Sequence, residues 1–198
     1  MGVAAVIAAV ASSGANAEGG SGGVTTPGAC EDVNFGERAL RLGDCGDDVK
    51  TLNWVLKSKT FAASVGLDKE FDDPTDSAVR EFQDRSGLSA SGVVNPKTRR
   101  ELKRSMSRKT ATLYGPGFWR NETACGKTLR RSTIGVAHKR LPCGTKVTFS
   151  KGGRWLRTRV IDRGPYSNGA SWDLTEKAAT ELGMEQTETV RSAVIGKK

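Results

Sequence analysis

The chain has 198 residues, of which 36% are hydrophobic and 27% are charged, and its formal net charge is +9. This composition describes a soluble globular protein and predicts no transmembrane span. The length suits one ordinary domain or two small ones.

The first 29 residues read as targeting and linker sequence. An apolar run from Val3 to Ala11 precedes Ala15-Asn16-Ala17, which has the pattern of a signal peptide with an A-x-A cleavage site, although no Lys or Arg comes before the run. We therefore expect residues 1–17 to be removed on export. Residues 18–29 (EGGSGGVTTPGA) have the composition of a flexible linker.

Residues 30–105 contain three short helix patterns. In GDDVKTLNWVLKSK, Asp47 is a candidate N-cap, and apolar residues recur on one helix face at 49, 52, 55 and 56. In DDPTDSAVREFQDRSG, Asp73 precedes a proline and Gly87 is a stop signal. NPKTRRELKRSM begins with another cap-like pair, Asn95-Pro96. We predict a small helical domain with a modest core.

Three motifs of this segment, LRLGDCGDDVKTLNWVL, SAVREFQDRSGL and GVVNPKT, occur in an order and at intervals that resemble the peptidoglycan-binding domain 1 family. The resemblance covers residues 36–104, and the chain has Asn95 where the family usually has glycine. It implies wall binding. The alternative is a helical spacer that binds nothing, and no binding residue can be named from the composition.

After the basic junction KRSMSRKT, residues 106–198 contain brief strand-like runs interrupted by Gly and Pro. The runs are ATLYGPGFW, VTF and WLRTRVI, and the strong helix signal is DLTEKAATELGM. Short strands at close spacing predict a small all-β barrel with one short helix.

The four cysteines of an exported chain suggest two disulfides, for which three pairings are possible. Pairing within each half is the simplest choice, giving Cys30–Cys45 and Cys125–Cys143. The cysteines are too far apart, and the single histidine too few, for a zinc site, so we expect no metal and no cofactor.

The charge is concentrated in the second half. Residues 106–198 contain 18 Lys/Arg and seven Asp/Glu, a net charge of +11. Such a module suits anionic wall polymers or the carboxylates of peptide stems, and nucleic acid is an alternative supported by charge alone. The charge also serves solubility.

Five motifs in order resemble the RlpA-like double-psi β-barrel over residues 110–195. They are Tyr114-Gly115-Pro116-Gly117, Ala137-His138, Leu141-Pro142-Cys143-Gly144-Thr145, Asp162-Arg163-Gly164-Pro165 and Asp173-Leu174-Thr175. The resemblance implies a six-stranded barrel related to expansins, inverting endoglucanases and lytic transglycosylases, and the Cys125/Cys143 pair resembles a disulfide variant of it.

Asp162 is the favoured catalytic residue, because the resemblance places a catalytic aspartate at this motif and a strand end presents side chains at a barrel mouth. Inverting hydrolysis needs a second carboxylate roughly 6.5–9.5 Å away, whereas a lytic transglycosylase uses the sugar's own hydroxyl and can work with one acid/base. The alternative is a structural aspartate in a Gly-Pro turn. A neighbouring Arg159 or Arg163 that held Asp162 ionised would suit a binder.

Asp173 and Glu176 fit a capping box at the start of a helix, and this structural role is slightly preferred. Expansins carry a groove aspartate in the corresponding motif, so a substrate contact is the alternative. His138 either lines the groove or packs as a neutral side chain.

Six aromatic residues are many for so small a module, and sugars stack on exposed aromatic faces. They are Tyr114, Phe118, Trp119, Trp155, Tyr166 and Trp172. Because Tyr114, Trp119 and Trp172 lie in or beside the loop motifs, we expect these three to contact substrate.

One residue departs from the family pattern. RlpA-type transglycosylases typically have a glutamate after the glycine of TACGKTL, and this chain has Lys127. Lysine cannot replace a carboxylic acid as proton donor at similar cost, and its charge would lower the pKa of Asp162. Glu122 is more easily explained as a solvated loop residue.

These patterns together predict a secreted, cell-wall-associated monomer that binds peptidoglycan glycan strands and cuts them as a lytic transglycosylase with Asp162 as single acid/base. The alternative is a non-catalytic, expansin-like wall binder or wall-loosening protein. We expect neither a specific nucleic-acid partner nor a membrane span.

Overall fold

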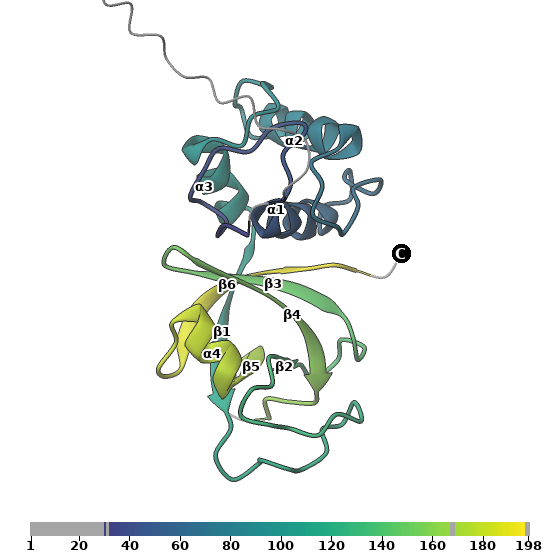
Figure 1. Ribbon diagram of the computed structural model, residues 1–198. Coiled ribbons are helices and arrows are strands. Elements are labelled where there is room, and N and C mark those ends of the chain that lie inside the picture. Colours follow the sequence, from purple (N-terminus) through teal and green to yellow (C-terminus); the bar gives the residue numbers. More distant parts are fainter. Residues whose placement is uncertain (1–29, 31, 167–168, 197–198) are drawn as a thin grey trace, which may run out of the picture.

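The computed structural model describes residues 30, 32–166 and 169–196, so the expected signal peptide (1–17) and linker (18–29) lie outside the described residues. Three helices form one end of the molecule and a closed β-barrel forms the other (Figure 1). This confirms the predicted fold class. Within the described part, no helix has the length and apolarity needed to cross a membrane.

The helical domain contains α1 (Asp47–Lys57), α2 (Asp73–Arg85) and α3 (Pro96–Arg104). The apolar face predicted for α1 is the one that is buried, with residues 49, 52, 55 and 56 fully covered. Leu102 of α3 is also fully buried and belongs to the same core.

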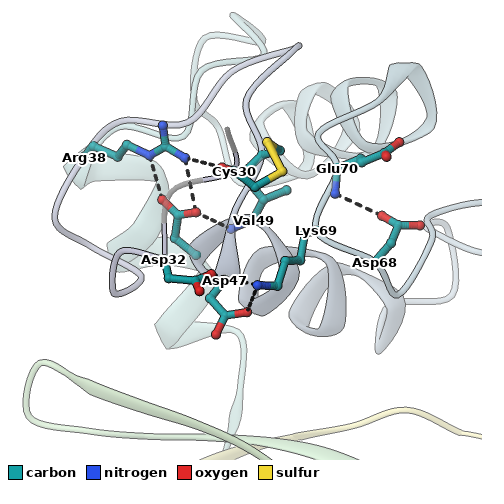
Figure 2. The surroundings of a disulfide bond; sticks show 10 residues. Cys30, Asp32, Arg38, Asp47, Val49, Asp68, Lys69 and Glu70 are labelled. Carbon is teal, nitrogen blue, oxygen red and sulfur yellow. Dashed lines mark hydrogen bonds and ion pairs between the residues drawn. A yellow bond between two sulfur atoms is a disulfide. The ribbon is translucent and has the colours of Figure 1, made fainter. Parts of the chain in front are cut away.

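The predicted helix starts are partly wrong. Asn95 caps α3 as expected, because its side chain accepts a hydrogen bond from the Thr98 N–H. The cap of α2 is Asp72, one residue before the predicted Asp73. Asp47 does not cap α1 but is its first residue, and it forms an ion pair with Lys69 (Figure 2). Lys69 also contacts Asp32, so it links the N-terminal segment to the start of α1.

The barrel contains β1 (Ser107–Tyr114), β2 (Val136–Ala137), β3 (Lys146–Lys151), β4 (Arg154–Asp162), β5 (Trp172–Thr175) and β6 (Glu188–Val194). The strands close in the order β1-β5-β2-β4-β3-β6. The β1–β5 and β2–β4 pairs are parallel and the other pairs are antiparallel. A crossed order of this kind brings residues that are distant in sequence to neighbouring strands.

The short helix α4 (Glu176–Leu182) follows β5 directly. Its N-cap is Thr175, whose hydroxyl accepts a hydrogen bond from the Ala178 N–H. The predicted capping role of Asp173 is therefore wrong: Asp173 is a strand residue, and β5 continues to Thr175. The helix ends at Gly183, which has a left-handed backbone (φ 72°) suited to glycine.

Two disulfides are present, Cys30–Cys45 in the helical half and Cys125–Cys143 in the barrel. The first lies beside the start of α1 (Figure 2). The second ties the loop between β1 and β2 to the residues that lead into β3, so it constrains the loop nearest the end of β4.

Candidate functional site

A groove of about 720 Å³ lies where strand ends and connecting loops of the barrel meet. Its floor includes Thr112, Ala137 and the two aspartates Asp162 and Asp173, and its rim includes Phe118 and Tyr166. These residues come from segments spread over more than 50 positions of the sequence. The crossed strand order is what brings them together.

The strand register places the aspartates on either side of Ala137. Ala137 of β2 pairs with Asp173 of β5 on one side and with Asp162 of β4 on the other. Two strand spacings separate their backbones by roughly 10 Å. Because Trp172 and Leu174 are buried in the barrel core, the alternation of side chains along β5 directs Asp173 to the opposite face.

Asp162 is partly buried and is held by backbone donors. Its Oδ1 accepts hydrogen bonds from the Ala124 N–H at 2.9 Å and from the Arg163 N–H at 2.8 Å. Neither of these backbone donors binds Oδ2. One oxygen of Asp162 therefore organises the loop before Cys125, and the other is available to a ligand in the groove.

Asp173 is half-buried, and the Thr112 hydroxyl donates a hydrogen bond to its Oδ1 at 2.7 Å. Burial is the main reason that the pKa of Asp173 is raised above its ordinary value, and the negative charge of Asp162 raises it further. The Thr112 hydrogen bond opposes this only in part. Asp173 is therefore the carboxyl group in the groove that holds its proton more readily than a free aspartate.

No Lys or Arg in the described part of the chain forms an ion pair with either aspartate. Arg163, expected as a possible partner of Asp162, directs its guanidinium to the backbone oxygens of Leu141 (3.0 Å) and Asp162 (3.4 Å) instead. Arg159 is exposed on β4 and lies outside the groove lining. Arg163 therefore lines the groove without neutralising Asp162 or Asp173 through a side-chain ion pair.

Tyr114 lines the groove, as expected, and its hydroxyl is buried with no hydrogen-bond partner in the part of the chain that the structure describes. Burial raises the pKa of Tyr114, and the charges of Asp162 and Asp173 act in the same direction. The tyrosine is therefore neutral beside the two carboxyl groups, and its hydroxyl is placed to donate toward Asp162, which also raises its pKa.

The other sequence-predicted contacts lie elsewhere. Trp172 is only 2% exposed and packs in the barrel core, with its indole N–H donating to Ser192 Oγ at 3.2 Å. His138 packs against Trp172 at a ring distance of 4.6 Å, and its Nδ1 accepts hydrogen bonds from the backbone N–H groups of Arg140 and Leu141. Burial, with Arg163 and other cations nearby, lowers the pKa of His138. Trp172 is therefore a core residue and not a groove residue, and His138 has the packed position that was the alternative to lining the groove.

Trp119 also lies outside the groove lining. Its ring covers Gly115 so closely that a Cβ at this glycine would meet the ring at 2.8 Å. The Trp119 ring thus packs on the turn that follows β1. It fits there because Gly115 has no side chain to occupy the same space.

Sequence reasoning missed the two exposed aromatics of the rim. Phe118 is 55% exposed and Tyr166 is 81% exposed, and both line the groove. Each directly follows a Gly-Pro turn, in Gly115-Pro116-Gly117-Phe118 and in Gly164-Pro165-Tyr166. Aromatic residues just after such turns lie on loops and not in the barrel core, so their position in the sequence could have predicted that they are exposed.

Lys127 is exposed in a tight turn between Asn121 and Leu129, where its backbone pairs with Thr123. It is not part of the groove lining. Glu122 is also exposed and forms an isolated bridge with Thr128. Among the described residues, no three His, Cys, Asp or Glu side chains gather into a group that could hold a metal ion.

Comparison with known families agrees with this architecture. Residues 107–194 match the lytic transglycolase family of double-psi barrels, and residues 45–102 match a peptidoglycan binding domain family. The barrel is an RlpA-like double-psi β-barrel domain. The helical domain that precedes it is of the peptidoglycan-binding type.

Curated relatives match this chain over a stretch of 79 to 90 residues. The endolytic peptidoglycan transglycosylase RlpA of Campylobacter jejuni is 41% identical over 90 residues, which are 43% of this chain and 33% of that protein. The probable endolytic peptidoglycan transglycosylase RlpA of Synechocystis sp. is 38% identical over 79 residues, 39% of this chain and 25% of that protein. The match thus spans a third or less of these relatives.

Two solved structures show more distant likeness. A Streptomyces papain inhibitor aligns with a TM-score of 0.34 at 23% identity, covering 45% of this chain and 97% of the inhibitor. The expansin of Clavibacter michiganensis aligns with a TM-score of 0.39 at 18% identity, covering 47% of this chain and 52% of the expansin. Neither adds to the assignment of the barrel.

Proposed function

We propose that the protein is an exported cell-wall protein that binds peptidoglycan and cuts its glycan strands by transglycosylation in the groove of the RlpA-like barrel. The observation that carries this proposal is the pair of aspartates flanking Ala137. No cation of the described residues forms an ion pair with either of them, and the pKa of Asp173 is raised. The relatives named as peptidoglycan transglycosylases and the peptidoglycan-binding type of the helical domain support the choice of substrate.

The sequence favoured Asp162 as the single acid/base, and the groove suggests a division of roles. A general acid must hold its proton near working pH, and Asp173 is the carboxyl group whose pKa is raised. Asp162 has an oxygen, Oδ2, that its backbone donors leave unused and that can accept a proton. We assign Asp173 as proton donor and Asp162 as proton acceptor.

The reaction then needs no water. Asp173 gives its proton to the glycosidic oxygen as the bond from that oxygen to the anomeric carbon breaks, which releases a new hydroxyl end. The 6-hydroxyl of the same sugar bonds to the anomeric carbon, and its proton passes to Asp162. One intramolecular ether forms for the one glycosidic bond that breaks, and proton exchange between the two carboxyl groups restores the starting state.

The groove surface supports a carbohydrate ligand. Phe118 and Tyr166 present aromatic faces on the rim, and sugar rings stack on such faces. The net charge of +11 over residues 106–198 favours approach to anionic wall polymers, with an attraction that salt screens. The proposal also includes the division of the chain: removal of residues 1–17, a linker over 18–29, and domains over 30–105 and 106–198.

The second candidate function is a non-cleaving, expansin-like wall binder. Lys127 favours this second candidate. It stands where the family typically has a glutamate, so position 127 contributes no carboxyl group to catalysis. Both candidates predict binding, and they differ in whether new chain ends form.

The test is overnight digestion of purified peptidoglycan, intact and stripped of its peptides, with soluble products identified by mass spectrometry. Wild type should release anhydro-sugar ends, and the Asp162→Asn and Asp173→Asn proteins should still sediment with the wall material while releasing few. Sedimentation of the wild type without any new chain ends would favour the non-cleaving binder.

A further inference from the structure

A second cavity, separate from the groove, lies between the helical domain and the barrel. This interdomain cleft has a volume of about 930 Å³ and is lined by α1, α3, the segment 33–37, the β3–β4 turn and the first residues of β4. In Figure 1 the β3–β4 turn lies close to α3. The cleft shares no lining residue with the catalytic groove.

Contacts between the two domains hold the cleft in shape. Arg157 of β4 forms an ion pair with Asp47 of α1 at 3.2 Å, and Lys103 of α3 donates to the Gly152 carbonyl in the β3–β4 turn. Phe35 and Trp155 meet edge to face at 4.9 Å. The cleft is thus built from both domains, and neither domain alone would form it.

The cleft has more cationic than anionic side chains. Its five cationic side chains are Arg99, Arg100, Lys103, Arg154 and Arg157. Its three acidic side chains are Glu37, Asp47 and Glu181. Their charges leave an excess of +2 inside the cleft.

Each acidic side chain is already engaged, whereas donors remain on the cations. Glu37 accepts from Asn34, Asp47 pairs with Lys69 as well as Arg157, and Glu181 pairs with Lys177. These acids therefore leave little capacity to satisfy further donors in the cleft.

Two arginines of the cleft have guanidinium groups whose hydrogen-bond donors are incompletely paired. Nη1 of Arg157 is buried and has no hydrogen-bond partner in the described ranges of the chain. Arg100 is 58% exposed, and its ion pair with Glu101 is long, at 3.8 Å. The exposed guanidinium of Arg100, with only a long ion pair, suits a carboxylate or phosphate ligand. The buried Arg157 donor without an acceptor is a local cost that a small shift of its side chain toward such a ligand would relieve.

The apolar part of the lining decides between these anions. Trp155 and the 43%-exposed Ile134 lie in the same cleft as the arginines. A peptide offers both carboxylates and aliphatic groups to such a surface, whereas a phosphate polymer offers a regular row of charges with no aliphatic side chains. Charge and apolar contact together match a short acidic peptide.

We propose that the interdomain cleft binds the peptide stems of peptidoglycan through their carboxylates. This rests on the proposed function, in which peptidoglycan is the substrate, and it assigns the peptide part of that substrate to a site distinct from the catalytic groove. A glycan strand cut in the groove would then be held by its peptides at the junction of the two domains.

The test measures binding of free stem peptide, released from peptidoglycan by an amidase, to the full chain by isothermal titration calorimetry. The double variant Arg100→Gln/Arg157→Gln should bind at least tenfold more weakly than wild type, and a stem peptide with amidated carboxylates should bind wild type equally weakly. Arg100→Gln alone, an exposed change, should weaken binding severalfold and serves if the double variant does not fold. Arg159→Gln, an exposed arginine on the same strand and outside the cleft, should bind as wild type does.

Equal binding by wild type and Arg100→Gln, or equal binding of the amidated peptide, would overturn the proposal. Tighter, Arg157-dependent binding of poly(glycerol phosphate) than of stem peptide would also overturn it, in favour of a phosphate polymer. The stem peptide contains no glycosidic bond, so its binding does not depend on cleavage. Stem binding without anhydro-sugar products would contradict the proposed transglycosylase and leave the cleft assignment standing.

Discussion

The helical domain and the barrel each contain an aspartate that is withdrawn from solvent, and the two aspartates differ in their hydrogen-bond and charge partners. Asp48 in α1 is 1% exposed, and it accepts from Arg38 Nε at 2.7 Å and from the backbone N–H of Val49, in the region that Figure 2 shows. Asp173 in β5 accepts a hydrogen bond from a threonine hydroxyl, has no ion-pair partner among the residues that the structure describes, and has a raised pKa. A carboxylate surrounded by donors stabilises a fold, whereas one left without a counter-charge remains available for proton transfer.

The same contrast applies to the two disulfides. Cys30–Cys45 lies beside the start of the helical core, where it closes the N-terminal segment. Cys125–Cys143 follows Ala124, whose N–H binds Asp162. The first bond serves stability, and we expect the second to serve the position of a groove carboxylate.

The largest effect is expected from Asp173→Asn. If Asp173 is the general acid, its loss should lower the rate of anhydro-sugar release about 10³-fold, within the usual range for such a group. The amide keeps the size of the side chain and can still accept from Thr112, so folding should be unaffected. Product release is quantified by mass spectrometry, with Asp84→Asn, an exposed aspartate of α2, as the control. A rate within threefold of wild type would exclude Asp173 as the acid.

A smaller but still large effect is expected on stability from Asp48→Ala. The change removes the carboxylate that Arg38 binds, and breaking a buried ion pair from one side costs about 3–5 kcal/mol. We expect the lower end, about 3 kcal/mol, because the Arg38 side chain is 28% exposed. Urea unfolding measures the loss, and Asp84→Ala provides the matched comparison. A loss below about 0.5 kcal/mol would show that the pair contributes as little as a surface ion pair.

A roughly tenfold loss of rate is expected when both barrel cysteines are replaced by serine. Without the Cys125–Cys143 bond, the loop that presents the Ala124 N–H is less constrained, and Asp162 loses part of its orientation. Removing Cys30–Cys45 should instead lower the free energy of unfolding by about 3 kcal/mol, as expected for a loop of this length, with the rate per folded molecule unchanged. Equal rates for the two double variants would contradict the distinction.

The sequence predicted much of the fold because periodic patterns are local. The apolar face of α1, the Asn95-Pro96 start of α3 and the short strands of a small barrel all follow from spacing and turn residues. The site was harder to predict, because its geometry depends on strand register. Ala137 as the residue between the two aspartates, and the extension of β5 through Thr175, are set by pairings between distant segments.

The aromatic residues illustrate the same limit. Trp172 was expected in the groove because it lies beside a loop motif. Successive side chains of a strand point to opposite faces, so Trp172 is buried in the barrel core while its neighbour Asp173 faces the groove. His138 follows Ala137 and is directed away from the groove by the same alternation. Phe118 and Tyr166 were not among the three aromatics expected to contact substrate, although both follow turns.

The smallest effect, and the sharpest test of the groove, concerns the charge of Asp162 on Asp173. Burial is the larger cause of the raised pKa of Asp173 and the Asp162 charge a smaller one, so Asp162→Asn should lower this pKa without returning it to its ordinary value. The carboxyl carbon of labelled aspartate, followed by NMR across a pH titration, reports it directly. A folded-state pKa above the unfolded one gives stability that is present below the unfolded value and is lost as pH rises through the folded value. In Asp162→Asn that loss should be smaller and should finish at a lower pH, whereas Asp84→Asn should titrate as wild type does. An unchanged Asp173 titration in Asp162→Asn would mean that the two carboxyl groups do not sense each other, and the division of roles between proton donor and acceptor would then lose its electrostatic basis.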